Sequence, residues 1–462
     1  MAITIQQQPT SPGMVNSDLV WTVSSNYSTY PQFQYVCDLY VSGSGTLLQR
    51  LKQQPNPNAR AVFDLGTLIS QYTSTRSDLI KTHYISGSTV ENRSFIVKFG
   101  EEFGSSVSSS VALYTGIGNA TAGQPAKTGS AYYDFTNGLV EPNGAINWNF
   151  PSGSYLSYQT VGTAATASYD TWLTNAPTTQ SMGSSEYATL SIYNGNFNGS
   201  TTVAQDVFWA DVRFYNTASA MIGLSIPMPN ITGSGYLGIV GPGPRTSISQ
   251  SWSTASANQN SYTRLIHIGC GSQNLNEMTG GNIDTNYAGW DYYEVSVYGQ
   301  NISVPDINSV IAKRRFKRSS LNCGYDGVRF AWKNEFGVWD YYTFTLQTDS
   351  AVGIERQSYE QSFVDFSTAT TSVYNKQRRG QSQFYNDLTQ VKTANSNWLT
   401  QDEADWLREL FFSADVYYQD GTDVLPCVIT SANVVEKTNP RTQKLFQYQI
   451  EFQPANQLRP RV

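Results

Sequence analysis

The chain has 462 residues and a formal net charge of −6 at pH 7, with 14% charged and 13% aromatic residues. This length predicts two to four domains, and the wealth of Ser, Thr, Asn, Gln and Gly is typical of loop-rich β proteins. The charge gives no general attraction to nucleic acid, and no stretch reaches the roughly 20 apolar residues of a membrane span.

Residues 1–18 are polar, and Pro9 and Pro12 disfavour a helix, so this segment predicts an extended N-terminal arm. An arm can add its backbone hydrogen bonds to the sheet edge of a neighbour. We therefore expect deletion of residues 1–18 to leave a folded protein that assembles poorly. The start has no basic or apolar signal region, which predicts synthesis in a cytoplasm without secretion.

Residues 19–135 alternate between apolar and polar side chains, which predicts a β-sandwich. In the segment RSFIVKFGEEFG, Phe95, Val97 and Phe99 are expected on one face of a strand. Glu101 and Glu102 follow directly, and adjacent residues on a strand point apart, so this pair gives no sign of two cooperating glycosidase carboxylates.

Residues 136–312 predict a second β domain with long loops, because short strand-like pieces are separated by glycine-rich and asparagine-rich stretches. The stretch CGSQNLNEMTGGNIDTNYAGW, residues 270–290, is expected to be one of these loops. The glycines of GIVGPGP, residues 238–244, form another loop, since two prolines remove amide donors that a phosphate cradle needs. Trp290 and Tyr292 are expected to pack within strands; the alternative is that their ring faces stack a sugar, as possible glycan contacts.

Residues 313–318, KRRFKR, are the only dense basic run. They predict a solvated basic linker. The alternative is an electrostatic contact for an acidic neighbouring subunit or for packaged nucleic acid.

Residues 319–462 predict a C-terminal β domain with one helix. A hairpin turns at Asn334–Gly337, and its candidate packing and assembly residues are Trp332, Trp339, Tyr342 and Phe344. In the segment LTQDEADWLRELFFS, Thr400 and Glu403 predict a capping box, with an inner stripe of Ala404, Leu407, Leu410 and Phe411.

Catalytic motifs are scarce in the sequence. His83 and His267 are the only histidines, and neither lies in a nucleophile motif, so each is expected to be a partly exposed strand residue. Four scattered cysteines are expected to be small buried side chains rather than disulfides, and no spacing predicts a metal or cofactor site. The acidic residues Asp402, Glu403 and Asp405 suit a helix N-terminus.

Three segments in order resemble virion structural, tail-associated proteins of crAss-like and related tailed bacteriophages. They are ITIQQQPTSPGMVNSDLVW with the strands after it, VRFAWKNEFGVWDYYTF, and NWLTQDEADWLRELFFSADVYY with KLFQYQIEFQPANQ. The second resembles the family signature R-x-x-W-x-N-x-x-G-x-x-D-x-Y-x-F, which falls here on Arg329, Trp332, Asn334, Gly337, Asp340, Tyr342 and Phe344. The middle region is not covered by the resemblance.

The resemblance implies a non-enzymatic building block of a phage virion, assembled in the host cytoplasm as a symmetric oligomer in the tail or head–tail region. Its partners would be other copies of itself and other virion proteins, with no cofactor. A tail adhesin that binds a receptor or host surface glycan is the alternative, and a tail-borne polysaccharide depolymerase is the least favoured reading. We expect a mainly β fold of sandwich-like or jelly-roll-like domains.

Overall fold

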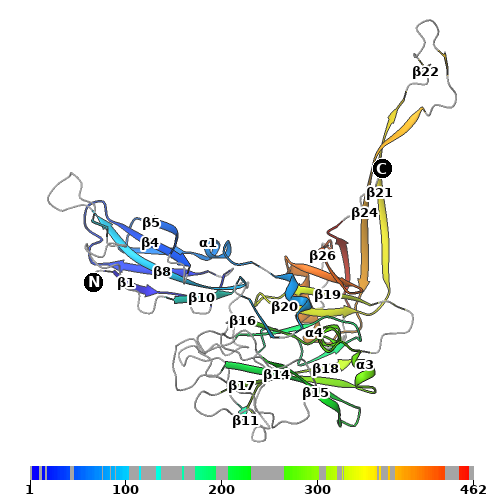
Figure 1. Cartoon of the computed structure of the whole chain (residues 1–462). Helices are drawn as coiled ribbons and strands as arrows, with labels where there is room; N and C mark the ends of the chain where they lie inside the picture. The colour runs from blue at the N-terminus through cyan, green and yellow to red at the C-terminus, as the bar shows by residue number, and fades with distance from the viewer. Residues whose placement is uncertain are drawn as a thin grey trace. The chain divides into compact units, whose positions relative to one another are not determined.

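The fold is given by a computed structural model, which describes residues 3–9, 13–15, 18–41, 46–74, 76–83, 85–88, 90–103, 114–115, 132–136, 159–160, 172–193, 206–229, 265–300, 309–319, 325, 327–361, 364–365, 373–374, 380–431 and 447–456. These residues form a mainly β protein with several sheets and few helices, as the composition predicts (Figure 1). The chain divides into two compact units rather than three domains. Unit 1 contains Met1–Ser319 and Lys333–Asp340, and unit 2 contains Ser320–Trp332 and Tyr341–Val462.

The N-terminal part of unit 1 is a β-sandwich of two sheets, with strand orders β1-β3-β6 and β2-β10-β8-β4-β5, and with β9 beside β8. A short helix and a 3-10 turn follow β6. The bounds are Ile3–Gln7 (β1), Gly13–Met14 (β2), Val20–Ser25 (β3), Gln34–Val41 (β4), Leu47–Gln53 (β5), Arg60–Asp64 (β6), Gly66–Ser70 (α1), Ser77–Lys81 (η1), Asn92–Phe103 (β8), Tyr114–Thr115 (β9) and Tyr132–Thr136 (β10).

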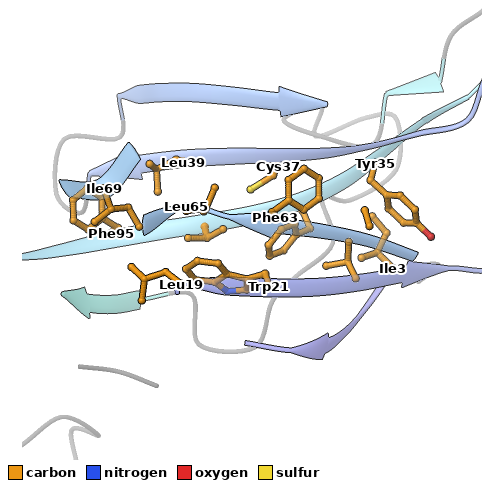
Figure 2. Packing of buried hydrophobic residues seen from close by; sticks show 14 of the residues in the cluster. Ile3, Leu19, Trp21, Tyr35, Cys37, Leu39, Phe63, Leu65, Ile69 and Phe95 are labelled. Carbon is orange, nitrogen blue, oxygen red and sulfur yellow. The ribbon is translucent and has the colours of Figure 1, made fainter. Parts of the chain in front are cut away.

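The sandwich core lies between these two sheets (Figure 2). Trp21 and Phe63 of the smaller sheet are buried in one cluster with Cys37 and Phe95 of the larger sheet. On β8 the buried side chains alternate as predicted, since Phe95, Val97 and Phe99 are all fully covered. Each large apolar side chain contributes about 1.5–3 kcal/mol on burial, so this cluster is a main source of stability for the sandwich.

The described part of residues 1–18 pairs with its own chain, so the expectation of an extended arm available to a neighbour is wrong there. Strand β1 pairs antiparallel with β3, so that Ile3 lies opposite Ser25 and Ile5 opposite Val23. Ile3 and Val15 are buried in the sandwich core. Proline at positions 9 and 12 excludes a helix but leaves a strand free to form on either side of the prolines.

The rest of unit 1 contains a three-stranded sheet, β13-β16-β7, and a six-stranded sheet, β11-β18-β17-β14-β15, with β12 beside β18. Its elements are Ile85–Ser88 (β7), Gln159–Thr160 (β11), Thr179–Met182 (β12), Thr189–Tyr193 (β13), Asp206–Tyr215 (β14), Met221–Pro229 (β15), Leu265–Gly269 (β16), Ser272–Thr279 (α2), Ile283–Asn286 (α3), Tyr292–Gln300 (β17) and Ser309–Arg318 (β18).

Two expectations for this region are corrected. β7 comes from the predicted first domain but pairs with β16 of the predicted second domain, so residue 135 is not a domain boundary. Residues 270–290 are not a long loop, because they contain α2 and α3, and α2 ends at Gly280 in the left-handed conformation that favours glycine. The glycine-rich loop 238–244 lies outside the described residues.

The basic run 313–318 is not a linker, because it forms most of strand β18 in the six-stranded sheet. Arg314 is buried, and its Nη1 atom donates hydrogen bonds to the carbonyl oxygens of Ala176 and Pro177, each at 3.0 Å. Lys313 and Arg315 both pair with Glu294. Glu294 therefore offsets part of the positive charge of this run within the chain, so the run is less available to an outside partner than a solvated linker would be.

Unit 2 is built on a seven-stranded sheet of order β20-β19-β25-β26-β27-β24-β21, with a separate pair β22-β23. The hairpin predicted around Asn334–Gly337 is part of this sheet. The bounds are Val328–Lys333 (β19), Trp339–Phe344 (β20), Thr348–Glu360 (β21), Val364–Asp365 (β22), Val373–Tyr374 (β23), Gln381–Asn395 (β24), Gln401–Phe412 (α4), Val416–Asp420 (β25), Asp423–Ile429 (β26) and Gln449–Pro454 (β27).

Helix α4 begins as the sequence predicts. The Thr400 side chain and the Glu403 side chain form a reciprocal capping box. Ala404, Leu407 and Leu410 are buried. In the described part of the chain, no helix combines the length and the apolar character needed to cross a membrane.

Candidate assembly surface

Strands β21 and β24 form a long antiparallel ribbon that extends beyond the other strands of its sheet (Figure 1). Among the described residues, β24 pairs with β27 only through Lys392–Asn395, so no other described strand borders most of the ribbon. Every residue of β21 from Asp349 to Glu360 is exposed. An isolated two-stranded ribbon is marginally stable in water, so this element is a candidate for burial against another chain.

The two faces of the ribbon differ in side-chain size. Cross-strand partners share a face, and Val352 pairs with Gln390 while Ile354 pairs with Leu388. We call this side the apolar face; Val352 and Ile354 are 55% and 51% exposed on it. The opposite side carries the mostly small residues Ala351, Gly353, Thr389 and Val391 beside these positions, and the larger Tyr385 lies beyond them toward the bulge.

The two faces also differ in charge. On the small-residue side, Glu355 lies directly opposite Asp387, and we call this side the acidic face. Arg356 lies on the apolar face one residue further along. None of these three side chains has an ion pair among the residues that the structure describes. Two facing acids repel each other, so a cation from outside the chain would stabilise this position.

A β-bulge lies further along the ribbon. Gln357 pairs with Tyr385 and Ser358 pairs with Gln383, which leaves Phe384 as the extra residue. Phe384 is 77% exposed, more than any other large apolar side chain in the described part of the chain. The aromatic ring of Tyr359 touches it edge-on.

The hairpin residues predicted for packing are covered within the chain. Trp332 packs on Trp406 of α4, with ring centroids 5.2 Å apart, and Phe344 packs edge-on against Phe330. Tyr342 also contacts Trp406, and burial with nearby Glu403 raises the pKa of Tyr342. Trp339, in unit 1, donates from Nε1 to the carbonyl oxygen of Arg76 at 3.1 Å. A role in a subunit interface stays a prediction for all four.

The turn of this hairpin is held by Asn334, which is buried. Its Oδ1 atom accepts hydrogen bonds from the backbone amides of Phe336 and Val338, each at 3.1 Å, and its Nδ2 atom donates to the carbonyl of Leu173 at 2.8 Å. Gly337 follows with a φ of 77°. The asparagine and glycine of the predicted turn therefore have separate structural roles.

Trp290 and Tyr292 contact neighbouring side chains and do not form an open sugar-stacking platform. Trp290 is buried, and its Nε1 atom donates to Asp284 at 2.8 Å. Tyr292 stacks on Tyr215 at 5.0 Å, and the guanidinium of Arg315 lies 4.4 Å from the centre of the Tyr292 ring. These neighbours already occupy the ring faces that a sugar would need.

His267 lies on strand β16 as expected, but it is fully buried rather than partly exposed, and that part of the expectation is wrong. It is the centre of a polar network that the sequence did not predict. Its Nδ1 atom lies 2.8 Å from Ser191 Oγ, and its Nε2 atom lies 2.9 Å from Glu91 Oε2. Ser191 is the cross-strand partner of His267, and Glu91 also accepts a hydrogen bond from the amide of Arg76. The set resembles a serine–histidine–acid arrangement, but all three side chains are buried, and their hydrogen bonds satisfy one another.

His83 is partly exposed, as predicted, but it lies in a connection rather than a strand. Its Nε2 atom is 2.6 Å from Glu277 Oε2. Partial burial raises the pKa of Glu277, but hydrogen bonds from Tyr187, Gln273 and His83 outweigh that effect and lower it. Both histidines belong to unit 1.

The remaining candidate chemistry is packed into the fold. Burial raises the pKa of Glu101, although the Ser25 hydroxyl donates to its Oε2 atom at 2.5 Å. Cys37, Cys270 and Cys427 are buried free thiols, and Cys323 lies outside the described residues. No three His, Cys, Asp or Glu side chains gather as a metal site in the part of the chain that the structure describes.

Compared with protein-family models and with curated proteins, the chain matches none.

Proposed function

We propose that this chain is a non-enzymatic structural component of a tailed-bacteriophage virion, and that it assembles as a symmetric oligomer in the tail or head–tail region. The observation that carries the proposal is the exposed β21–β24 ribbon. Its apolar side chains Val352, Ile354 and Phe384 are each more than half exposed. Burying them against a neighbouring copy would stabilise an assembly.

The resemblance of three segments to tail-associated virion proteins supports the phage setting. The second segment falls on hairpin β19–β20, and the third on α4 with the closing strands. These elements form the body of the sheet from which the ribbon extends. The strands that carry the resemblance and the two strands of the ribbon therefore belong to the same sheet.

The rival functions receive less support from the described residues. For a glycan-binding adhesin, the two candidate stacking rings are not open, because Trp290 is buried and Tyr292 has Tyr215 and Arg315 against its ring. A depolymerase would need reactive groups open to substrate. The Ser191, His267 and Glu91 side chains are 4%, 0% and 0% exposed.

Quantitative mass spectrometry of purified particles tests the proposal. We expect the chain to be present in every particle at a fixed copy number that is a multiple of a ring symmetry. Its presence in infected-cell lysate together with its absence from purified particles would contradict a virion role.

A further inference from the structure

We propose that the β21–β24 ribbons of neighbouring copies stack face to face, with the apolar face of one copy covering the acidic face of the next. This inference rests on the proposed function as an oligomeric subunit and names the surface that makes the oligomer. The occupant of each face is a second copy of this chain. All ribbons in the stack point in the same direction, as cyclic symmetry requires.

The side chains on the two faces of the ribbon differ in size. The apolar face presents Val352, Ile354 and Leu388. At the same height along the ribbon, the acidic face presents the smaller set Ala351, Gly353, Thr389 and Val391. A surface of large side chains fits against a surface of small ones at the spacing of about 10 Å between packed sheets.

Gly353 gives a separate indication of close approach by another chain. Glycine weakens a strand interior, so its presence there calls for a reason. A Cβ atom at this position would meet its nearest neighbour, the Thr389 carbonyl oxygen, at 3.6 Å, which is ordinary contact. The backbone of Gly353 does not have a positive φ. No described residue of the chain requires glycine there, whereas a neighbour packed against the acidic face would.

The charges on the two faces of the ribbon are complementary. Arg356 on the apolar face and the pair Glu355 and Asp387 on the acidic face are one residue apart along the ribbon, about 3.3 Å. When ribbons stack in the same direction without an offset, the guanidinium of one copy reaches the two carboxylates of the next. Each of these charges, which has no ion pair among the described residues, then gains one, and the repulsion between the two acids is offset.

The stack predicts a ring rather than a two-fold dimer. The two faces are different, so the contact is heterologous, and each copy keeps one free face until the ring closes. A ribbon of about 12 residues is roughly 40 Å long and 10 Å wide, which gives about 800 Å² per contact when both sides are counted. Stable interfaces bury about 1,200–2,000 Å², so other parts of the chain must add to the contact.

Reversing the charges on each face of the ribbon, in the full-length chain, tests the inference. Arg356→Glu places acid against acid, and the double variant Glu355→Lys/Asp387→Lys places base against base. Each variant alone should raise the apparent dissociation constant of the oligomer by at least about tenfold. A 1:1 mixture of the two should restore an oligomer with alternating copies, because each contact again joins opposite charges. Glu451→Lys, an exposed charge reversal on β27, is the matched control and should have no effect.

Gly353→Val tests the shape argument without charge. Valine favours strands, so the folded monomer should keep its circular dichroism spectrum and melting temperature, while the oligomer is lost. Gln449→Val, at an exposed position of β27, is the control. Sedimentation velocity over a range of concentrations is the measurement for all variants.

The outcomes separate the two proposals. If the wild type forms a ring and Gly353→Val and the charge variants keep it, the stacked ribbon is wrong but the assembly function stands. If the single charge variants fall apart and their mixture also fails to assemble, opposite faces do not meet and the inference is overturned. A wild-type chain that stays monomeric at every concentration contradicts the ribbon stack, and the particle measurement then decides the virion role by itself.

Discussion

Glu355 and Asp387 lie directly opposite each other across strands β21 and β24, with no cation paired to either in the described part of the chain. Like charges at such a position destabilise a strand pair by about 0.2–1 kcal/mol. The ribbon therefore carries an internal repulsion that a neighbouring basic side chain would remove. This relationship between two residues connects the fold of the single chain to its proposed assembly.

Replacement of Asp387 by Asn should have opposite effects on the ribbon and on the oligomer. In a dilute, monomeric sample, removal of one negative charge should slow hydrogen exchange of the β21 and β24 amides. At high concentration the same variant should weaken self-association, because Arg356 of the neighbour loses one of its carboxylates. Hydrogen–deuterium exchange and sedimentation velocity measure the two effects, and an equal or stronger oligomer would contradict the account.

Trp332→Ala should destabilise unit 2 by about 3–5 kcal/mol, because Trp332 is fully buried against Trp406. Trp398→Ala is the matched control, since Trp398 is 61% exposed, and its effect on stability should be within about 0.5 kcal/mol. Urea denaturation followed by circular dichroism gives both values. Similar losses in the free energy of unfolding for the two variants would show that Trp332 is not a core residue.

His267→Ala should cost about 1.5–3 kcal/mol of stability, because it removes a hydrogen bond to the buried carboxyl group of Glu91. Ser191→Ala should cost only about 1 kcal/mol, the loss of one hydrogen bond. The readout is the free energy of unfolding in urea. A fluorophosphonate probe should leave Ser191 of the folded wild type unlabelled, and specific labelling there would instead support a serine hydrolase.

Deletion of residues 1–9 should destabilise the N-terminal sandwich, because it removes β1 and the buried Ile3 side chain. We expect a lower melting temperature and loss of protection from proteolysis within residues 19–103. Ile3→Asp should have a smaller effect in the same direction. A deletion variant with wild-type stability that only fails to assemble would restore the free-arm interpretation.

The pH dependence of the sandwich should reveal Glu101. Burial raises its pKa above the ordinary value of 4.5, outweighing the hydrogen bond from Ser25. The folded state then binds the proton more tightly than the unfolded state, so ionisation of Glu101 lowers stability as pH rises from the unfolded pKa through the folded pKa. Glu101→Gln should therefore melt at a higher temperature than wild type near pH 8, with the difference vanishing near pH 4. A constant difference across this range would contradict the burial argument.

Local patterns predicted the elements whose signals are contained in a few residues. The Thr400 and Glu403 capping box, the Asn334–Gly337 turn and the alternation along β8 all depend on neighbours in the sequence. The three are found where the sequence places them, because capping and turn chemistry act over two to four residues.

Long-range pairing decided the features that the sequence could not predict. Glu91 and His267 are 176 residues apart, and only the strand order β13-β16-β7 brings the histidine beside Ser191. In the sequence alone, the basic run 313–318 is typical of a solvated linker. Only the fold shows that Glu294 and Asp284 form ion pairs with its side chains. The ribbon has an alternating pattern at Val352 and Ile354, but their exposure depends on how far β21 extends past its sheet.

Electron cryo-microscopy of purified particles, with a label fused to this chain, tests the central claim most directly. The account predicts a closed ring of labelled copies in the tail or head–tail region, with neighbouring ribbons of β21 and β24 packed face against face. Single, separated copies at fibre tips, or particles without any label, would contradict it.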